Sequence, residues 1–441
     1  MKPFIVVQGP VATRSGYGNH TRDIVTALLK SNKYDVQIIS LPWGMTPMDA
    51  LRMDNPEHVE IDRHIARANI NRKPDVFIQI SVPNEFQPAG KYNIGITAGV
   101  ETDQPPGEFI EGCNKMDLIL ATSEFTKNTL EAVIYEKVDK NTNKMIGNVK
   151  IEKPIKVLFE GVDLNVYKKV DMKDVDTSVS EYLDTIPDAF NFLFVGHWLR
   201  GDMGQDRKDV GMMIKTFCEA FKNKSSHNRP GLILKTSHAT FSIMDRDEVE
   251  RKIQQIIEPY GNKIPNIYLI HGDLSDAEMN SLYNHNKVKA MISFTKGEGY
   301  GRPLLEFTLS EKPVIVSDYS GHKDFLKYAR FLPGDLTPVH RSAADQFILE
   351  GAKWFTVNYQ YAASVLRDCV DNYKSYLNLG KQQSRVSREE FNLDIMSKLL
   401  CEYVDAGISS VPQQVPIKLP NLSAPANAPK ISLPTLKKVT A

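Results

Sequence analysis

The chain has 441 residues, of which 41% are hydrophobic and 24% charged, a composition typical of folded globular proteins rather than of disordered or fibrous chains. Its length predicts two or three domains. Lys and Arg number 54, as do Asp and Glu. This balance argues against a protein that coats nucleic acid or a membrane surface, because such proteins need a field of one sign.

The cysteines are far apart in the sequence, with no CxxC pair and no histidine at metal-ligand spacing: Cys113, Cys218, Cys369 and Cys401. This distribution excludes a disulfide scaffold or zinc ribbon and fits a reducing compartment. No apolar run is long enough to span a bilayer, and the run at residues 4–7 is too short for a signal peptide. We therefore expect a cytoplasmic protein.

Short apolar runs alternate with helical patterns in the first part of the chain. The first helix is predicted at residues 19–30, after the first strand. Strands bounded by turn residues and separated by helices predict a parallel sheet covered on both faces. The strands of this first sheet are predicted at residues 4–8, 35–40, 75–80, 92–97, 117–121 and 155–159.

The same pattern restarts after a polar stretch at residues 168–185. We therefore expect an α/β protein with two doubly wound, Rossmann-like domains. The second set of strands is predicted at residues 192–195, 232–234, 267–270, 290–294 and 314–316, and long helices at residues 343–359, 361–377 and 388–404.

Four segments follow from this division. Residues 1–167 form one domain and residues 186–385 the other, and a helix at 386–406 packs back towards the first domain. Residues 411–441 contain six prolines and four lysines but no acidic or aromatic residue, which predicts a disordered or partner-docking tail.

The strongest motif is the stretch 296–306, which reads KGEGYGRPLLE after a predicted strand. Pro303 suits the first turn of a helix, and glycines before it let the backbone approach a ligand. The unpaired amides of such a helix start would favour an anion such as a diphosphate. Glu298 and Glu306 could face the same crevice and accept hydrogen bonds from sugar or ribose hydroxyls.

These residues resemble a known family. Glu298 and Glu306 match the E-x7-E pattern of retaining glycosyltransferases with the GT-B fold, and the stretch 274–321 resembles family 4. The first half of the chain also resembles that family, in which similar stretches occur in the same order: residues 95–103, 121–125 and 160–163. The similarity covers roughly residues 4–326, and it implies two domains that face a cleft.

The resemblance implies a role for several further residues. Lys208 matches a lysine of the family that neutralises the phosphates of the nucleotide sugar, and Arg207 is its companion. The chain departs from the family at His197, where many members have an arginine. The resemblance places the loop that contains Glu101 near the anomeric carbon of the donor sugar. The donor-binding residues implied by the resemblance are Gly16, Gly18, Gly299, Tyr300, Gly301 and Glu306.

Two other patterns are interpreted as structural. The loop around Gly16 and Gly18 is an incomplete GxGxxG, because Thr21 breaks it and no acidic residue ends the second strand for a ribose. Asp245-Arg246-Asp247 resembles the metal-binding DxD of another glycosyltransferase fold, but we expect one of its aspartates to cap a helix. No metal site and no cofactor are predicted.

The family resemblance implies transfer of a sugar, with retention, from a UDP- or GDP-linked donor to an acceptor hydroxyl, without a metal. A small-molecule, glycan or lipid-linked acceptor is favoured over nucleic acid, since the only basic track is the diluted segment 137–156. Two alternatives stay open: an inactive GT-B scaffold that serves as a binding protein, and an enzyme that glycosylates hydroxylated bases in DNA.

Overall fold

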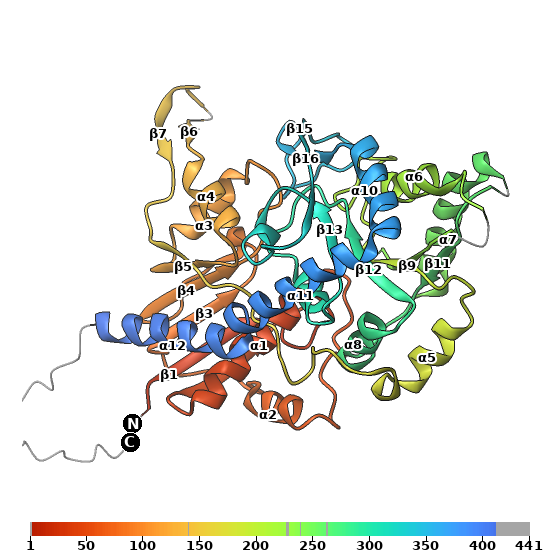
Figure 1. Ribbon diagram of the computed structural model, residues 1–441. Coiled ribbons are helices and arrows are strands. Elements are labelled where there is room, and N and C mark those ends of the chain that lie inside the picture. The colour runs from red at the N-terminus through yellow and green to blue at the C-terminus, as the bar shows by residue number, and fades with distance from the viewer. Residues whose placement is uncertain (1, 140, 226–228, 239, 262, 412–441) are drawn as a thin grey trace, which may run out of the picture.

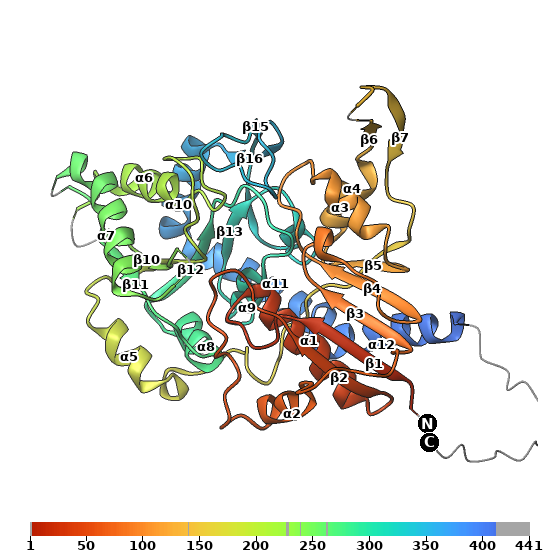
Figure 2. The ribbon, with the colours of Figure 1, turned by 180° about the vertical axis from the view of Figure 1, so that it is seen from behind.

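The computed structural model describes residues 2–139, 141–225, 229–238, 240–261 and 263–411. It contains two parallel six-stranded sheets with helices packed on their faces, and the sheets lie side by side (Figures 1 and 2). The tail predicted at 411–441 falls, from residue 412 onward, outside the described residues. Within the described part of the chain, no helix is long and apolar enough to cross a membrane.

The N-terminal sheet has the strand order β2-β1-β3-β4-β5-β8. All six strands pair in parallel, and side chains on both faces are buried because helices cover them. Its strands are β1 (Phe4–Gly9), β2 (Asp35–Ser40), β3 (Val76–Ile80), β4 (Tyr92–Thr97), β5 (Leu118–Ala121) and β8 (Ile155–Val157), and its helices are α1 (Gly16–Ser31), α2 (Pro56–His64), α3 (Gly107–Cys113) and α4 (Glu124–Ala132).

A hairpin that the sequence did not predict lies between α4 and β8. It consists of β6 (Tyr135–Val138) and β7 (Met145–Val149), paired antiparallel, and it projects from the N-terminal domain (Figure 1). Its side chains are mostly exposed, so the short polar segments lacked the buried pattern that marks a strand in a sequence.

The C-terminal sheet has the order β11-β10-β9-β12-β13-β14, again parallel throughout. This is the doubly wound Rossmann order, in which the chain reverses direction across the sheet between β9 and β12. The strands are β9 (Asn191–Val195), β10 (Gly231–Lys235), β11 (Ile267–Ile270), β12 (Val288–Ser293), β13 (Val314–Ser317) and β14 (Arg330–Leu332), with helices α5 (Thr177–Asp184), α6 (Val210–Phe221), α7 (Ile243–Ile257), α8 (Asp276–Asn284) and α9 (Arg302–Thr308).

The prediction of a helix at residues 343–359 is wrong. Residues 343–352 form turns, bends and irregular backbone, and β16 (Lys353–Val357) pairs antiparallel with β15 (Gly334–Pro338). Trp354 and Val357 are buried in β16, where aromatic and β-branched residues pack well, so tertiary pairing overrides the helical spacing that the sequence suggested.

The last three helices are α10 (Tyr359–Asp371), α11 (Tyr373–Glu390) and α12 (Leu393–Ser410). The helix predicted at 361–377 is thus two helices that meet at Asn372. α12 returns to the N-terminal domain, where it lies against α1 and β3 (Figure 1). Met396, Leu400 and Val404 join the N-terminal core, so this helix ties the end of the described chain to its beginning.

Candidate active site between the two domains

The candidate site begins at the switch point of the C-terminal sheet. β9 and β12 are neighbours there, and loops leave the carboxyl ends of both strands. The loop after β9 carries Arg207 and Lys208, and the loop after β12 carries Glu298. Ligands of doubly wound sheets bind in the crevice at this point. The fold therefore brings together residues that are about ninety positions apart in the sequence.

Glu298 is the centre of a buried charge cluster. Its side chain is 8% exposed, Lys208 Nζ donates to Oε1, and Arg207 donates to Oε2 over 3.2 Å. Burial by itself would raise the pKa of this carboxyl, but the two cations outweigh it and lower the pKa to about 2. Glu298 is therefore ionised at any physiological pH.

The same two cations have further binding capacity. Arg207 NH1 also lies 3.1 Å from Glu101 Oε1 and donates to the carbonyl of Gly297 over 2.9 Å. Its Nε is buried and has no hydrogen-bond partner among the described residues. Lys208 has three N–H donors, and one is directed at Glu298. Lys208, which lines the cleft, can thus bind another anion without losing Glu298.

Glu306 lies inside α9 and is also buried. Arg302 Nε donates to its Oε1 over 2.9 Å, and Tyr283 donates to Oε2 over 3.3 Å. Burial raises the pKa of Glu306 to about 7, with Arg302 opposing the rise and Asp276 adding to it. Two donors leave part of the acceptor capacity of a carboxylate free.

Arg302 is a site residue that the sequence analysis did not single out. Besides Glu306 it contacts Asp23 on α1, so this one guanidinium joins the two domains across the cleft. Asp23 and Arg302 are 15% and 14% exposed. The signal was present in the sequence, since Arg302 directly follows the glycine-rich loop, but its partner on α1 could not be predicted.

Two glycines of the loop after β12 allow the two domains to approach each other closely. A Cβ at Gly297 would overlap the backbone of Glu101, and one at Gly299 would overlap the backbone of Ala98. Ser123 Oγ donates to the carbonyl of Gly299 over 2.6 Å. The two glycines thus allow a close contact between the domains, a role that the sequence did not predict. Gly301 alone has a positive φ, 100°, as the residue that caps α9.

A cleft of about 1310 Å³ separates the domains. Of the residues expected at the site, all but one line it: Gly16, Glu101, Arg207, Lys208, Glu298, Gly299, Tyr300, Gly301 and Glu306. Gly18 is not part of the lining. It is buried in the first turn of α1, where a side chain would overlap the backbone of Thr13.

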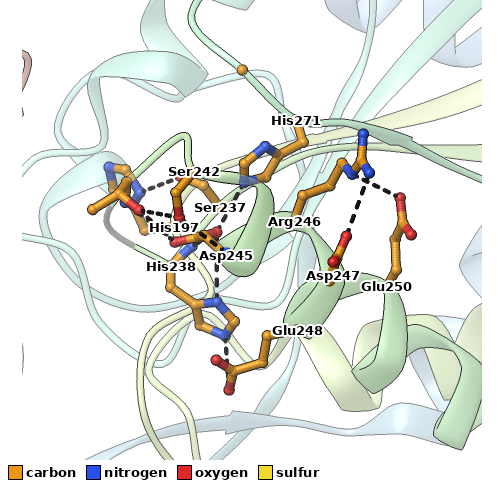
Figure 3. A network of polar contacts seen from close by, with 12 residues as sticks. His197, Ser237, His238, Ser242, Asp245, Arg246, Asp247, Glu248, Glu250 and His271 are labelled. Atoms are coloured by element: carbon orange, nitrogen blue, oxygen red, sulfur yellow. Dashed lines mark hydrogen bonds and ion pairs between the residues drawn. The ribbon is translucent and has the colours of Figure 1, made fainter.

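The aspartates of the DxD-like stretch point in different directions (Figure 3). Asp245 binds His271 Nε2 over 2.9 Å, while Asp247 is largely exposed beside Arg246. The helix cap is Ser242, so the expectation that an aspartate caps α7 is wrong. The described residues contain no cluster of three His, Cys, Asp or Glu side chains that could hold a metal ion.

Comparisons with known proteins bear on the fold. No model of a protein family matches the chain, and no curated protein matches its sequence. Solved structures do match. HepE of Anabaena, solved in complex with UDP and glucose, is 13% identical, with a TM-score of 0.56 over 92% of this chain and 100% of that one.

Two further structures agree. Sucrose-phosphate synthase of Thermosynechococcus elongatus has a TM-score of 0.62 at 12% identity, and the match covers 92% of this chain and 100% of that one. A glycosyltransferase of Rickettsia africae has a TM-score of 0.58 at 15% identity, covering 93% and 99%. The chain has the GT-B fold, in which two Rossmann-like domains face a cleft.

Proposed function

We propose that this protein is a retaining glycosyltransferase of the family 4 type, which transfers a sugar from a nucleoside-diphosphate sugar to an acceptor hydroxyl. The observation that carries the proposal is the convergence of Glu298, Arg207 and Lys208 at the switch point of a GT-B cleft. The crystal structures of HepE with UDP and with UDP-glucose support a donor of this class for the shared fold.

The proposed donor site assigns one role to each group. Glu306 accepts hydrogen bonds from the ribose hydroxyls, and the loop 299–301 faces the diphosphate. Glu298 holds the donor sugar, and Glu101 lies on the acceptor side of the cleft. Since the leaving group is a diphosphate, the main catalytic task is to stabilise the negative charge that grows on it.

Arg207 and Lys208 supply that stabilisation in the proposed mechanism. Their charges are balanced by ion pairs with Glu298 and Glu101. Both residues line the cleft, and the remaining N–H groups of Lys208 are available to the departing diphosphate. These fixed positive charges are the reason why we propose a metal-independent reaction, in which EDTA leaves activity intact.

Two alternative functions have less support. An inactive scaffold would have no need of three buried ionic side chains that converge in an open cleft, because burying charge costs stability. An enzyme acting on DNA would need a basic track. Within the candidate segment 137–156, the exposed strands β6 and β7 belong to a hairpin, and Lys137 of that hairpin already pairs with Glu111. The cytoplasmic location is proposed from four cysteines that are all free and buried.

Calorimetry with UDP and with GDP tests the donor site, and a panel of nucleotide sugars read by mass spectrometry tests transfer or slow hydrolysis. We expect one of the two nucleotides to bind and its sugar to be released. The anomeric coupling of the product, measured by NMR, tests retention. A protein that binds neither nucleotide would refute the proposed function.

A further inference from the structure

The N-terminal wall of the cleft carries an aromatic pair. Trp43, in the loop after β2, stacks on Tyr17 of α1 with ring centroids 4.2 Å apart and an angle of 25° between the planes. Tyr17 is fixed from the other side, because its hydroxyl contacts Thr97 Oγ1 at 3.1 Å and accepts from the amide of Ala98 at 3.0 Å. Trp43 is therefore held in place at the cleft, which both rings line.

Glu160 lines the same cleft and has no hydrogen-bond partner among the described residues, although the residue is only 6% exposed. Burying a carboxyl without a partner is costly, so such a group indicates a ligand. Burial raises the pKa of Glu160 to about 8, against a lowering by Arg302. At neutral pH the group is mostly protonated, so it can both donate and accept a hydrogen bond.

Tyr17 and Glu160 lie at the same edge of the N-terminal sheet. The Tyr17 hydroxyl contacts Thr97 at the end of β4, and Glu160 follows β8, two strands along the sheet, which corresponds to about 10 Å. Burial raises the pKa of the Tyr17 hydroxyl, and the charges of Glu101 and Glu160 raise it further. Glu160 also acts on Tyr300 of the donor loop, whose buried hydroxyl has no partner among the described residues. Trp43, Glu160 and Tyr300 all line the same cleft.

The cations of this wall are mostly engaged. Arg14 pairs with Asp49 over 2.7 Å and with Asp273, and Arg22 donates to two backbone carbonyls over 2.7 and 3.0 Å. Arg52 also lines the cleft but is exposed to solvent. An aromatic face beside a protonated carboxyl suits a ring that has an apolar face and hydroxyl groups, rather than a phosphate chain.

We infer that Trp43 and Glu160 form the acceptor subsite, and that the acceptor presents an uncharged carbohydrate ring there. The inference rests on the proposed function, which leaves the acceptor open. One face of the ring packs on Trp43, and its hydroxyls hydrogen-bond to Glu160, with Glu101 and the donor loop beyond it. The acceptor hydroxyl is then directed at the donor sugar held by Glu298.

The test is saturation-transfer NMR on the full chain, with methyl glucoside, methyl mannoside and maltose as probes, in the presence and absence of UDP. We expect at least one neutral glycoside to bind the wild type. Trp43→Ala and Glu160→Leu should each weaken that binding about tenfold, the equivalent of one lost hydrogen bond or a comparable apolar contact. Trp43→Phe and Glu160→Gln should retain most of it.

Two controls separate this inference from the proposed function. Met45→Ala changes an exposed residue of the same loop that does not line the cleft, and it should leave glycoside binding unchanged. UDP affinity should be the same in every variant. If the wild type binds UDP but no neutral glycoside, or binds only glucose 6-phosphate or a duplex oligonucleotide, the acceptor inference is wrong while the donor site stands. If glycosides bind and no nucleotide does, the proposed function is the part that fails.

Discussion

The protonation of Glu306 should control donor binding. Its pKa is raised to about 7 by burial, so the carboxylate that accepts the ribose hydroxyls in the proposed site exists mainly above that pH. The perturbation is therefore pH itself, compared between the wild type and Glu306→Gln. Because the acid has a raised pKa, the contribution is present above about pH 7 and is lost as the pH falls below it.

The size of the effect follows from two quantities. A carboxylate that accepts hydrogen bonds in a buried site contributes about 1.5–3 kcal/mol, so Glu306→Gln should weaken binding roughly 10- to 100-fold at alkaline pH. One pH unit below the pKa only about a tenth of Glu306 is ionised, so its advantage over Gln falls about tenfold. Arg302 opposes the raised pKa, and Arg302→Met should move the midpoint to higher pH.

The assay is calorimetric titration with an intact nucleotide sugar between about pH 5.5 and 9, a range that brackets the pKa. Both phosphates of such a donor are diesters, so they keep their charge over this range, whereas the terminal phosphate of UDP titrates near pH 6. The ratio of the two dissociation constants isolates Glu306 from other groups. A ratio that stays constant across the range would refute the assignment of Glu306 to the ribose.

Two further predictions concern catalysis and domain contact. Lys208→Met should lower kcat more than it weakens donor binding, because the diphosphate gains charge as the bond breaks; a loss confined to KM would make Lys208 a uniform binder. Gly299→Ala should push the donor loop off Ala98, which lowers the melting temperature and enlarges the radius of gyration in X-ray scattering. Gly16→Ala, where a Cβ would meet no atom within 4 Å, is the matched control, and equal behaviour of the two variants would contradict the close contact.

Local sequence patterns predicted much of the fold because parallel sheets have a simple signal. Their strands are buried on both faces, so apolar runs such as 4–8 and 192–195 are continuous and easy to recognise. Segments with mixed exposure were missed or misread for the converse reason. The hairpin β6–β7 has little buried surface, and β16 was taken for a helix because its partner β15 is not evident from its own residues.

The sequence by itself determined the order of the elements, the glycine-rich turn before α9 and the identity of the acids and bases available to the cleft. Their partners were decided only by the tertiary structure. Asp23 and Arg302 lie 279 residues apart and meet because the two domains close on each other. Glu160 is a candidate ligand-binding residue because it is buried without a hydrogen-bond partner among the described residues. Trp43 is a candidate because it stacks on Tyr17 at the cleft. Burial and long-range contact change the pKa of a side chain and the ligand it can bind, and neither is encoded within a window of neighbouring residues.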